Sequence, residues 1–221
     1  MKLTVNLGKN SYPIYIENNI LDKASSYISS CFSGKKIMII SDDNVFPLYG
    51  EKLKTSLGDY EVHELVLPHG EPTKAFETLP ALYNALLKQK FSRSDLVIAL
   101  GGGVIGDLAG FAASSYLRGI RFVQIPTSLL AQVDSSVGGK VAVDLPQGKN
   151  LVGAFYHPKL VLIDPQVLRT LPEHFIMDGM GEVIKYGCIL DRKLFELLNR
   201  CGSRVRVMER IVDVVYTCCD L

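Results

Sequence analysis

The chain has 221 residues, of which 48% are hydrophobic and 21% are charged, as in an ordinary soluble globular protein. Its 24 Lys and Arg residues are almost balanced by 23 Asp and Glu residues, giving a formal net charge of +1. This balance argues against a nucleic-acid-binding protein and against a polybasic membrane protein.

The cysteines and the apolar stretches exclude further classes of protein. The five cysteines form no C-x-x-C pair, which indicates buried, reduced thiols rather than a disulfide framework or a zinc knuckle. No signal-peptide core opens the chain, and the longest apolar stretch, 96–113, is broken by glycines and by Asp107. We therefore expect a cytoplasmic protein without a membrane span.

Strand and helix patterns alternate along the first 125 residues. Strands are predicted at 3–7, 12–16, 36–40, 60–67 and 95–99, and helices at 21–28 (with Asn18 or Asn19 as a cap), 45–56 and 73–90. The order βαβαβ predicts an α/β fold with a Rossmann-like, doubly wound parallel sheet.

The character of the sequence changes after Thr170. Pro172 is suited to open a helix, and residues 184–221 have a helical pattern with few glycines. We place a domain boundary there, so that residues 1–170 form the α/β domain and residues 171–221 begin an incomplete, all-helical domain. The second segment is too short to bury a good core alone.

The most informative motif is the run that follows the apolar strand at 95–99, Leu100-Gly101-Gly102-Gly103-Val104-Ile105-Gly106-Asp107. A strand that ends in glycines and turns into a helix presents bare N–H groups to a phosphate. The run lacks the G-x-G-x-x-G spacing, so a tight structural turn is an equally good interpretation. The carboxylate of Asp107 either interacts favourably with the positive end of the helix dipole or accepts a hydrogen bond from a ligand.

Polar clusters follow the predicted strands at 42–44, 69–74, 101–107 and 126–128. Ligands of such sheets bind beyond the carboxyl ends of the strands. Glu71 and Lys74 suit sugar hydroxyls and a negative charge, but they also fit an exposed pair at a helix start. Asp134, Lys140, Lys149 and Asn150 suit a phosphate or carboxylate, with a solvated loop as the alternative.

The segment Gly181-Glu182-Val183-Ile184-Lys185-Tyr186-Gly187 carries a further pair of charges. Glu182 and Lys185 lie three residues apart and so share one helix face. Glu182 could bind a metal while Lys185 holds an anionic substrate, or the two residues form a simple ion pair. The four histidines lack the spacing of a metal site, so satisfied or exposed side chains are the better interpretation for them.

Together these motifs resemble the 3-dehydroquinate synthase family of sugar phosphate cyclases. The resemblance runs from about residue 36 to 190, and also includes Tyr116-x-Arg118-Gly119, Pro126-Thr127-Ser128 and Gly148-Lys149-Asn150. It implies an NAD-binding α/β domain followed by a helical domain that completes a metal and substrate site. It also implies a homodimer of the full-length form.

The resemblance assigns a cofactor site to residues at the strand ends. They are Asp42, Asn44, His69, Gly70, Glu71, Pro72, Thr73, Lys74, Gly102, Gly103, Val104, Ile105, Gly106, Asp107, Thr127, Ser128, Lys140, Lys149, Val167, Leu168, Arg169 and Thr170. The implied reaction converts 3-deoxy-D-arabino-heptulosonate 7-phosphate to 3-dehydroquinate and phosphate in the shikimate pathway. NAD is used and regenerated in each turnover.

The resemblance also assigns catalytic roles to Lys140, Lys185, Asp134, Lys149, Asn150 and Arg118. Of these, Arg118 would bind the phosphate of the substrate held by the neighbouring subunit. Glu182 would be one ligand of a divalent metal, zinc or cobalt. The family's other two metal ligands are histidines that follow this region, and all four histidines here precede Glu182. We therefore expect this chain to bind NAD, to be inactive alone and to be poorly soluble. Gly181 stands where the family commonly has alanine, and we expect this departure to be tolerated.

Three other interpretations stay open. One is another sugar phosphate cyclase, such as 2-deoxy-scyllo-inosose synthase. Another is a glycerol-dehydrogenase-like oxidoreductase, which the lysines and Glu182 disfavour because a neutral polyol needs no phosphate-binding cations. The third is a non-catalytic dinucleotide-binding or dimerisation module, for which NAD binding without turnover is the telling result. Each takes a small molecule and no nucleic acid.

Overall fold

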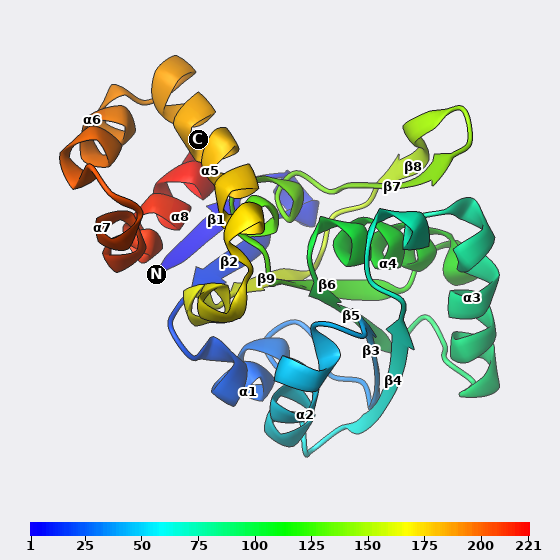
Figure 1. Cartoon of the computed structure of the whole chain (residues 1–221). Helices are drawn as coiled ribbons and strands as arrows, with labels where there is room; N and C mark the ends of the chain where they lie inside the picture. Colours follow the sequence, from blue (N-terminus) through cyan, green and yellow to red (C-terminus); the bar gives the residue numbers. More distant parts are fainter.

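The computed structural model describes residues 1–221 and has a seven-stranded sheet at its centre (Figure 1). The strand order is β1-β2-β9-β6-β5-β3-β4, and every neighbouring pair is parallel except β1 and β2. The strands are β1 (Lys2–Val5), β2 (Tyr12–Ile16), β3 (Lys36–Asp42), β4 (Glu61–Leu67), β5 (Leu96–Gly101), β6 (Arg121–Pro126) and β9 (Leu160–Ile163). The predicted α/β fold with a mostly parallel sheet is confirmed.

Helices cover both faces of this sheet. They are α1 (Ala24–Ile28), α2 (Phe46–Ser56), α3 (Leu79–Lys88), α4 (Gly103–Ser115), α5 (Glu173–Ile189), α6 (Arg192–Cys201), α7 (Arg204–Glu209) and α8 (Ile211–Asp220). In Figure 1, α3 and α4 lie on one side of the sheet and α1 and α2 on the other. None of the helices combines the length and apolar character that a bilayer-spanning helix needs.

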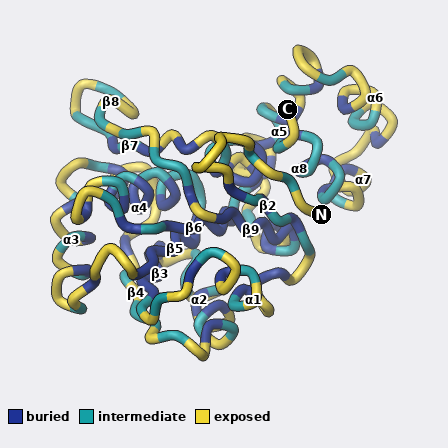
Figure 2. Tube along the Cα trace, turned by 180° about the vertical axis from the view of Figure 1, so that it is seen from behind, coloured by how far each residue is buried: buried dark blue, intermediate teal, exposed yellow.

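Alternation along the strands divides the core between the two faces. In β3, Met38 and Ile40 pack with α3 and α4, whereas Ile37 and Ile39 pack with α1 and α2. All six residues of β5 are buried, because a central parallel strand is covered on both sides. The central strands form the continuous buried part of the chain trace in Figure 2.

The C-terminal helices pack against the β1–β2–β9 end of the sheet. Ile14 and Ile163 share one apolar cluster with Ile176, Val183 and residues of α6 to α8. The segment after residue 170 thus buries its apolar side chains partly against the first strands. The two-domain division at residue 170 stays a prediction.

Helices α5 and α6 also leave large apolar side chains uncovered. Met177, Ile184 and Ile189 on α5 are exposed, as is Phe195 on α6. Such a surface favours association. Poor solubility stays a prediction.

A separate two-stranded hairpin, β7 (Lys140–Leu145) and β8 (Gly148–Phe155), lies beside α4. The loop predicted as the alternative for Lys140, Lys149 and Asn150 is therefore wrong, although all three side chains are exposed to solvent as that alternative predicted. The hairpin packs closely because α4 carries Gly110 at the contact, where an added Cβ would lie 2.4 Å from Val141 Cγ1. Long-range packing of this kind leaves little signal in the local sequence.

Two predicted local features differ from the structure. The helix predicted at 73–90 begins only at Leu79, because Pro80 occupies its first turn and Ala75 is extended, forming a bridge with Asp144. Asn19 makes no side-chain cap; its backbone is left-handed, and its N–H donates to Asp164.

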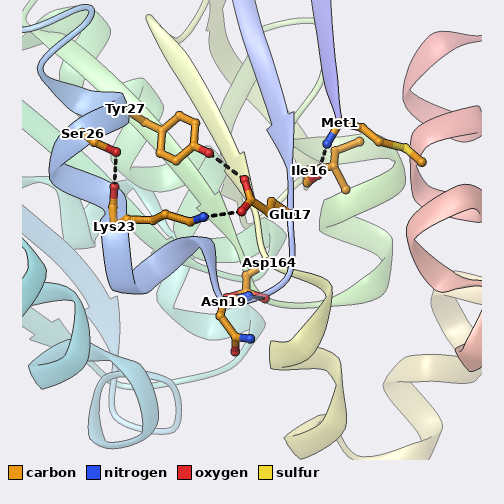
Figure 3. Close-up of polar contacts among 8 residues, drawn as sticks. All are labelled: Met1, Ile16, Glu17, Asn19, Lys23, Ser26, Tyr27 and Asp164. Carbon is orange, nitrogen blue, oxygen red and sulfur yellow. Dashed lines mark hydrogen bonds and ion pairs between the residues drawn. The ribbon is translucent and has the colours of Figure 1, made fainter.

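A polar network holds the end of β2 to the start of the following helix (Figure 3). The carboxylate of Glu17 accepts hydrogen bonds from Lys23 and from the hydroxyl of Tyr27, the latter at 2.7 Å. Asp164 Oδ1 accepts both the Asn19 N–H and the Gln166 N–H at 3.0 Å. Asp164 thereby fixes the turn Pro165–Thr170, which leads to the candidate site.

The thiols differ in burial, and this predicts their reactivity. Cys201 and Cys218 are buried, Cys188 is exposed, and no disulfide forms. Burial raises the pKa of Cys218 and Cys219 to about 12. We expect iodoacetamide at pH 8 to label Cys188 before Cys218 and Cys219, because a thiolate is the reactive form. Peptide mass spectrometry measures the order, and equal labelling of Cys218 in the folded chain would contradict it.

Candidate functional site

A cavity of about 1060 Å³ opens at the carboxyl ends of β3, β5 and β6. The predicted polar clusters meet there, as the parallel sheet requires. The sequence-predicted residues that line this site cavity are Asp42, Asn44, His69, Gly70, Glu71, Lys74, Gly102, Gly103, Val104, Asp107, Thr127, Ser128, Asp134, Lys140, Lys149, Asn150 and Thr170.

The glycine turn joins β5 to α4 at the wall of the site cavity. An added Cβ at Gly103 would lie 3.1 Å from Ser135 Oγ, and one at Gly102 would lie 3.4 Å from Ser128 Oγ. The glycines therefore permit a close approach of these hydroxyls. No side chain caps α4, so its first N–H groups are open to an anionic ligand.

An ion pair lies on the side of the cavity next to this turn. The Lys74 ammonium pairs with Asp107 and donates to Asn150 Oδ1 at 2.6 Å. Only 8% of the Lys74 side chain and 16% of the Asp107 side chain are exposed. Burial raises the pKa of Asp107, and the hydrogen bond from Lys74 opposes that shift. The pair offers a ligand a fixed carboxylate and a fixed cation in a weakly hydrated place.

A second, exposed ion pair lines the cavity. Lys149 Nζ lies 2.8 Å from Glu71 Oε1, and this bond raises the pKa of Lys149.

At the end of β3, Asp42 Oδ1 accepts hydrogen bonds from the N–H groups of Asn44 and Val45, at 3.0 and 2.9 Å. Asp42 therefore orders the start of α2 as well as lining the cavity.

Several cavity residues were not singled out by the sequence. Tyr49 on α2 donates to the Val167 carbonyl at 3.1 Å and contacts the Thr170 hydroxyl. Leu171, Pro172, Phe175 and Asp178 bring the start of α5 into the cavity wall. The signal for Tyr49 was its place one turn into a helix that follows a strand end; the α5 contacts depend on tertiary packing alone.

Some predicted cofactor residues do not line the cavity, namely Pro72, Thr73, Ile105, Gly106, Val167, Leu168 and Arg169. Thr73 is buried and donates to the Pro68 carbonyl at 2.6 Å, and Ile105 packs in the core beneath the glycine turn. These two residues support the loops from behind. A direct ligand contact for any of the seven stays a prediction.

Glu182, Lys185 and Arg118 also lie outside the cavity wall. Glu182 and Lys185 form an ion pair with each other on α5. Tyr186, one residue on, donates to Asp134 Oδ1 at 3.3 Å and so links α5 to the cavity. Burial, and then the charges of Asp134 and Glu182, raise the pKa of Tyr186, which keeps its hydroxyl a donor.

The arrangement does not by itself make a metal site. No group of three or more His, Cys, Asp or Glu side chains comes together in the structure. A catalytic zinc ion needs about three protein ligands, and Glu182 would supply one. Its role as a metal ligand stays a prediction.

The family model and the most similar curated relatives agree on one family. Residues 64–178, just over half of the chain, match the family model described as 3-dehydroquinate synthase N-terminal. The 3-dehydroquinate synthase of Clostridium botulinum (strain Alaska E43 / Type E3) is 58% identical over 222 residues, which cover 100% of this chain and 63% of that protein. That of Clostridium beijerinckii is 58% identical, over 98% of this chain and 63% of that protein. The chain thus spans less than two thirds of the length of these relatives.

A solved structure has the same fold at lower identity. The structure of 2-epi-5-epi-valiolone synthase from Streptomyces hygroscopicus, with NAD+ and Zn2+ bound, is similar with a TM-score of 0.86 and 31% identity. The match covers 98% of this chain and 61% of that one. A 2-deoxy-scyllo-inosose synthase complexed with carbaglucose-6-phosphate, NAD+ and Co2+ has a TM-score of 0.78 and 30% identity, over 84% of this chain and 50% of that one.

Proposed function

Because the chain belongs to the 3-dehydroquinate synthase family, we propose that its site cavity binds NAD and serves the conversion of 3-deoxy-D-arabino-heptulosonate 7-phosphate to 3-dehydroquinate and phosphate. One observation carries the proposal: the open helix start after the glycine turn, the Lys74–Asp107 pair and the two lysines Lys140 and Lys149 face one cavity. Such a cavity suits a dinucleotide and a small anion side by side.

The residues present fit NAD. The N–H groups at the start of α4 suit the pyrophosphate, because the helix dipole favours negative charge there. Glu71 and the free oxygen of Asp42 suit ribose hydroxyls, while the hydroxyls of Thr127 and Ser128 line the same wall. When bound, NAD supplies a hydride acceptor that later returns the hydride. Asp107, held by Lys74, would orient the ligand by accepting its donors.

The substrate part of the proposal rests on charge. Lys140 and Lys149 can hold phosphate or carboxylate, and Asp134 and Asn150 can accept or donate at hydroxyl groups. Because Lys185 is bound to Glu182, it would have to leave that ion pair to reach a ligand. Arg118 lies outside the cavity, so we propose that it serves the cavity of a second copy in a homodimer.

The metal part of the proposal is narrower. The single carboxylate of Glu182 does not fit a catalytic zinc or cobalt ion by itself, so no step is derived through a metal. We propose that Glu182 is one metal ligand and that further side chains complete the metal site. We also propose that the chain divides at residue 170 into a cofactor-binding part and a helical part.

A second candidate function is that of another sugar phosphate cyclase, since a 2-deoxy-scyllo-inosose synthase has a similar structure. The relatives at 58% identity favour the heptulosonate over a hexose phosphate. A non-catalytic dinucleotide-binding or dimerisation module is the third candidate, and the exposed apolar side chains of α5 suit its association with a second copy.

Calorimetric titration with NAD tests the proposal. We expect saturable binding of one NAD per chain with a Kd between about 1 µM and 1 mM, the usual range for enzyme substrates. Phosphate release is then assayed with NAD, a divalent ion and either the heptulosonate phosphate or glucose 6-phosphate. Release from glucose 6-phosphate alone would favour the second candidate. Because this chain is expected to be inactive alone, NAD binding without phosphate release agrees with the first candidate as well as with the third, and phosphate release from the heptulosonate phosphate would rule out the third. A folded chain that gives no saturable heat would overturn the cofactor site.

A further inference from the structure

We propose that Asp144, on β7, is a positioning residue that holds Asn150 and Lys74 in their places at the site cavity. Asp144 does not line the cavity, and no family motif drew attention to it. The inference rests on the proposed binding of NAD, because Lys74 and Asn150 matter to that ligand.

The first observation is an irregularity in the hairpin. The strand register passes from Val143 opposite Val152 to Leu145 opposite Gly148, so Asp144 alone faces the three residues 149–151 of β8. A bulge of this kind bends a strand and redirects its side chains. Two residues of the bulge, Lys149 and Asn150, line the site cavity.

The second observation is how the bulge is held. Asn150 has a left-handed backbone, with φ at +57°, a conformation that asparagine adopts more readily than other residues except glycine but that is not its preferred one. The N–H of Asn150 donates to Asp144 Oδ1 at 2.7 Å. A carboxylate is a strong acceptor for such an orphaned N–H, so it stabilises the bulge in this one geometry.

The third observation is that the same residue also bonds to the backbone of the segment that carries Lys74. The N–H of Asp144 donates to the Lys74 carbonyl at 2.7 Å, and Asp144 forms a parallel bridge with Ala75. Lys74 in turn donates to Asn150 Oδ1 and pairs with Asp107. Asp144 therefore closes a ring in which the backbone and the side chain of Lys74 are both tied to the bulge.

The physical consequence is preorganisation of the cavity. Without the Asp144 carboxylate, the Asn150 N–H loses its partner and Asn150 can leave the left-handed conformation. Its Oδ1 would then move away from Lys74, whose ammonium would keep Asp107 as its only bonded partner. A ligand would have to reorder these groups on binding and would bind more weakly.

The test compares Asp144→Ala with Asp144→Asn, since the amide oxygen of asparagine can still accept the Asn150 N–H. We expect Asp144→Ala to raise the Kd for NAD about tenfold and Asp144→Asn to change it less than about threefold. In the Asn150→Gly background, which tolerates the positive φ, Asp144→Ala should add little to the Kd, because the Asn150 Oδ1 contact with Lys74 that Asp144 is proposed to hold is already absent. Asp213→Ala, an acid removed from a surface ion pair on α8, is the matched control.

Amide hydrogen exchange separates this inference from the proposed function. The Asn150 N–H should exchange at least about tenfold faster in Asp144→Ala than in the parent chain, while amides of β5 stay protected. If the parent chain does not bind NAD, the proposed function fails, yet faster exchange still supports the role of Asp144 in the bulge. Unchanged exchange at Asn150, or an NAD Kd equal to that of the parent chain, would overturn the inference.

Discussion

Replacing Asp107 with alanine is expected to weaken NAD binding by about 10- to 100-fold, the equivalent of losing one or two charge-assisted hydrogen bonds. The carboxylate is largely buried against Lys74, so its removal leaves the ammonium with Asn150 alone and takes an acceptor from the ligand. Calorimetric titration of the parent chain and the variant measures the change in Kd.

The matched control for this variant is Asp22→Ala, which also removes one acid from an ion pair with lysine. The Asp22–Lys52 pair is exposed and neither residue lines the site cavity, so its loss should leave the Kd for NAD unchanged within about twofold. Thermal unfolding of both variants checks that the fold persists. Equal binding by Asp107→Ala and the parent chain would remove Asp107 from the proposed site.

Gly179→Ala is expected to destabilise the fold by about 1–3 kcal/mol, whereas Gly181→Ala, two residues along α5, should stabilise it by up to about 1 kcal/mol. An added Cβ at Gly179 would lie 2.6 Å from Leu129 Cβ and 2.7 Å from the Leu130 nitrogen, so the helix would have to move. At Gly181 nothing lies within 4 Å, and alanine is the better helix former.

Thermal denaturation of the two variants measures this difference. For a chain of this length, 1 kcal/mol corresponds to a shift in Tm of about 2–4 °C, so the variants should move in opposite directions from the parent. An unchanged Tm for Gly179→Ala would mean that α5 does not pack on Leu129 as described, and a lower Tm for Gly181→Ala would mean that the space around Gly181 is not open.

The sequence predicted the features that depend on local periodicity. Buried runs such as 36–40 and 95–99 alternate with amphipathic segments, and this order is sufficient for a parallel sheet with helices on both faces. Because parallel strands end at one edge, the positions of Asp42, Glu71 and Asp107 after three strands were sufficient to bring them to one cavity.

Other parts of the site depended on contacts between distant segments. The pairing of Lys74 with Asp107 and Asn150 joins three elements, and the hairpin that carries Asn150 is fixed by its packing on Gly110 of α4. Strand propensity is weak for a sequence rich in Gly, Lys and Asn, so 148–155 gave no clear strand signal. The start of α3 at Leu79 likewise follows from the bridge between Ala75 and Asp144, which is not local.

The sequence by itself therefore determined the fold class and the set of residues near the strand ends, because period and order are properties of the chain alone. The tertiary structure decided that Lys74 pairs with Asp107 and Asn150, that Lys149 pairs with Glu71, and that the Asp144 N–H donates to the Lys74 carbonyl. These contacts depend on distances between segments far apart in sequence, and such distances are set by how the whole core packs.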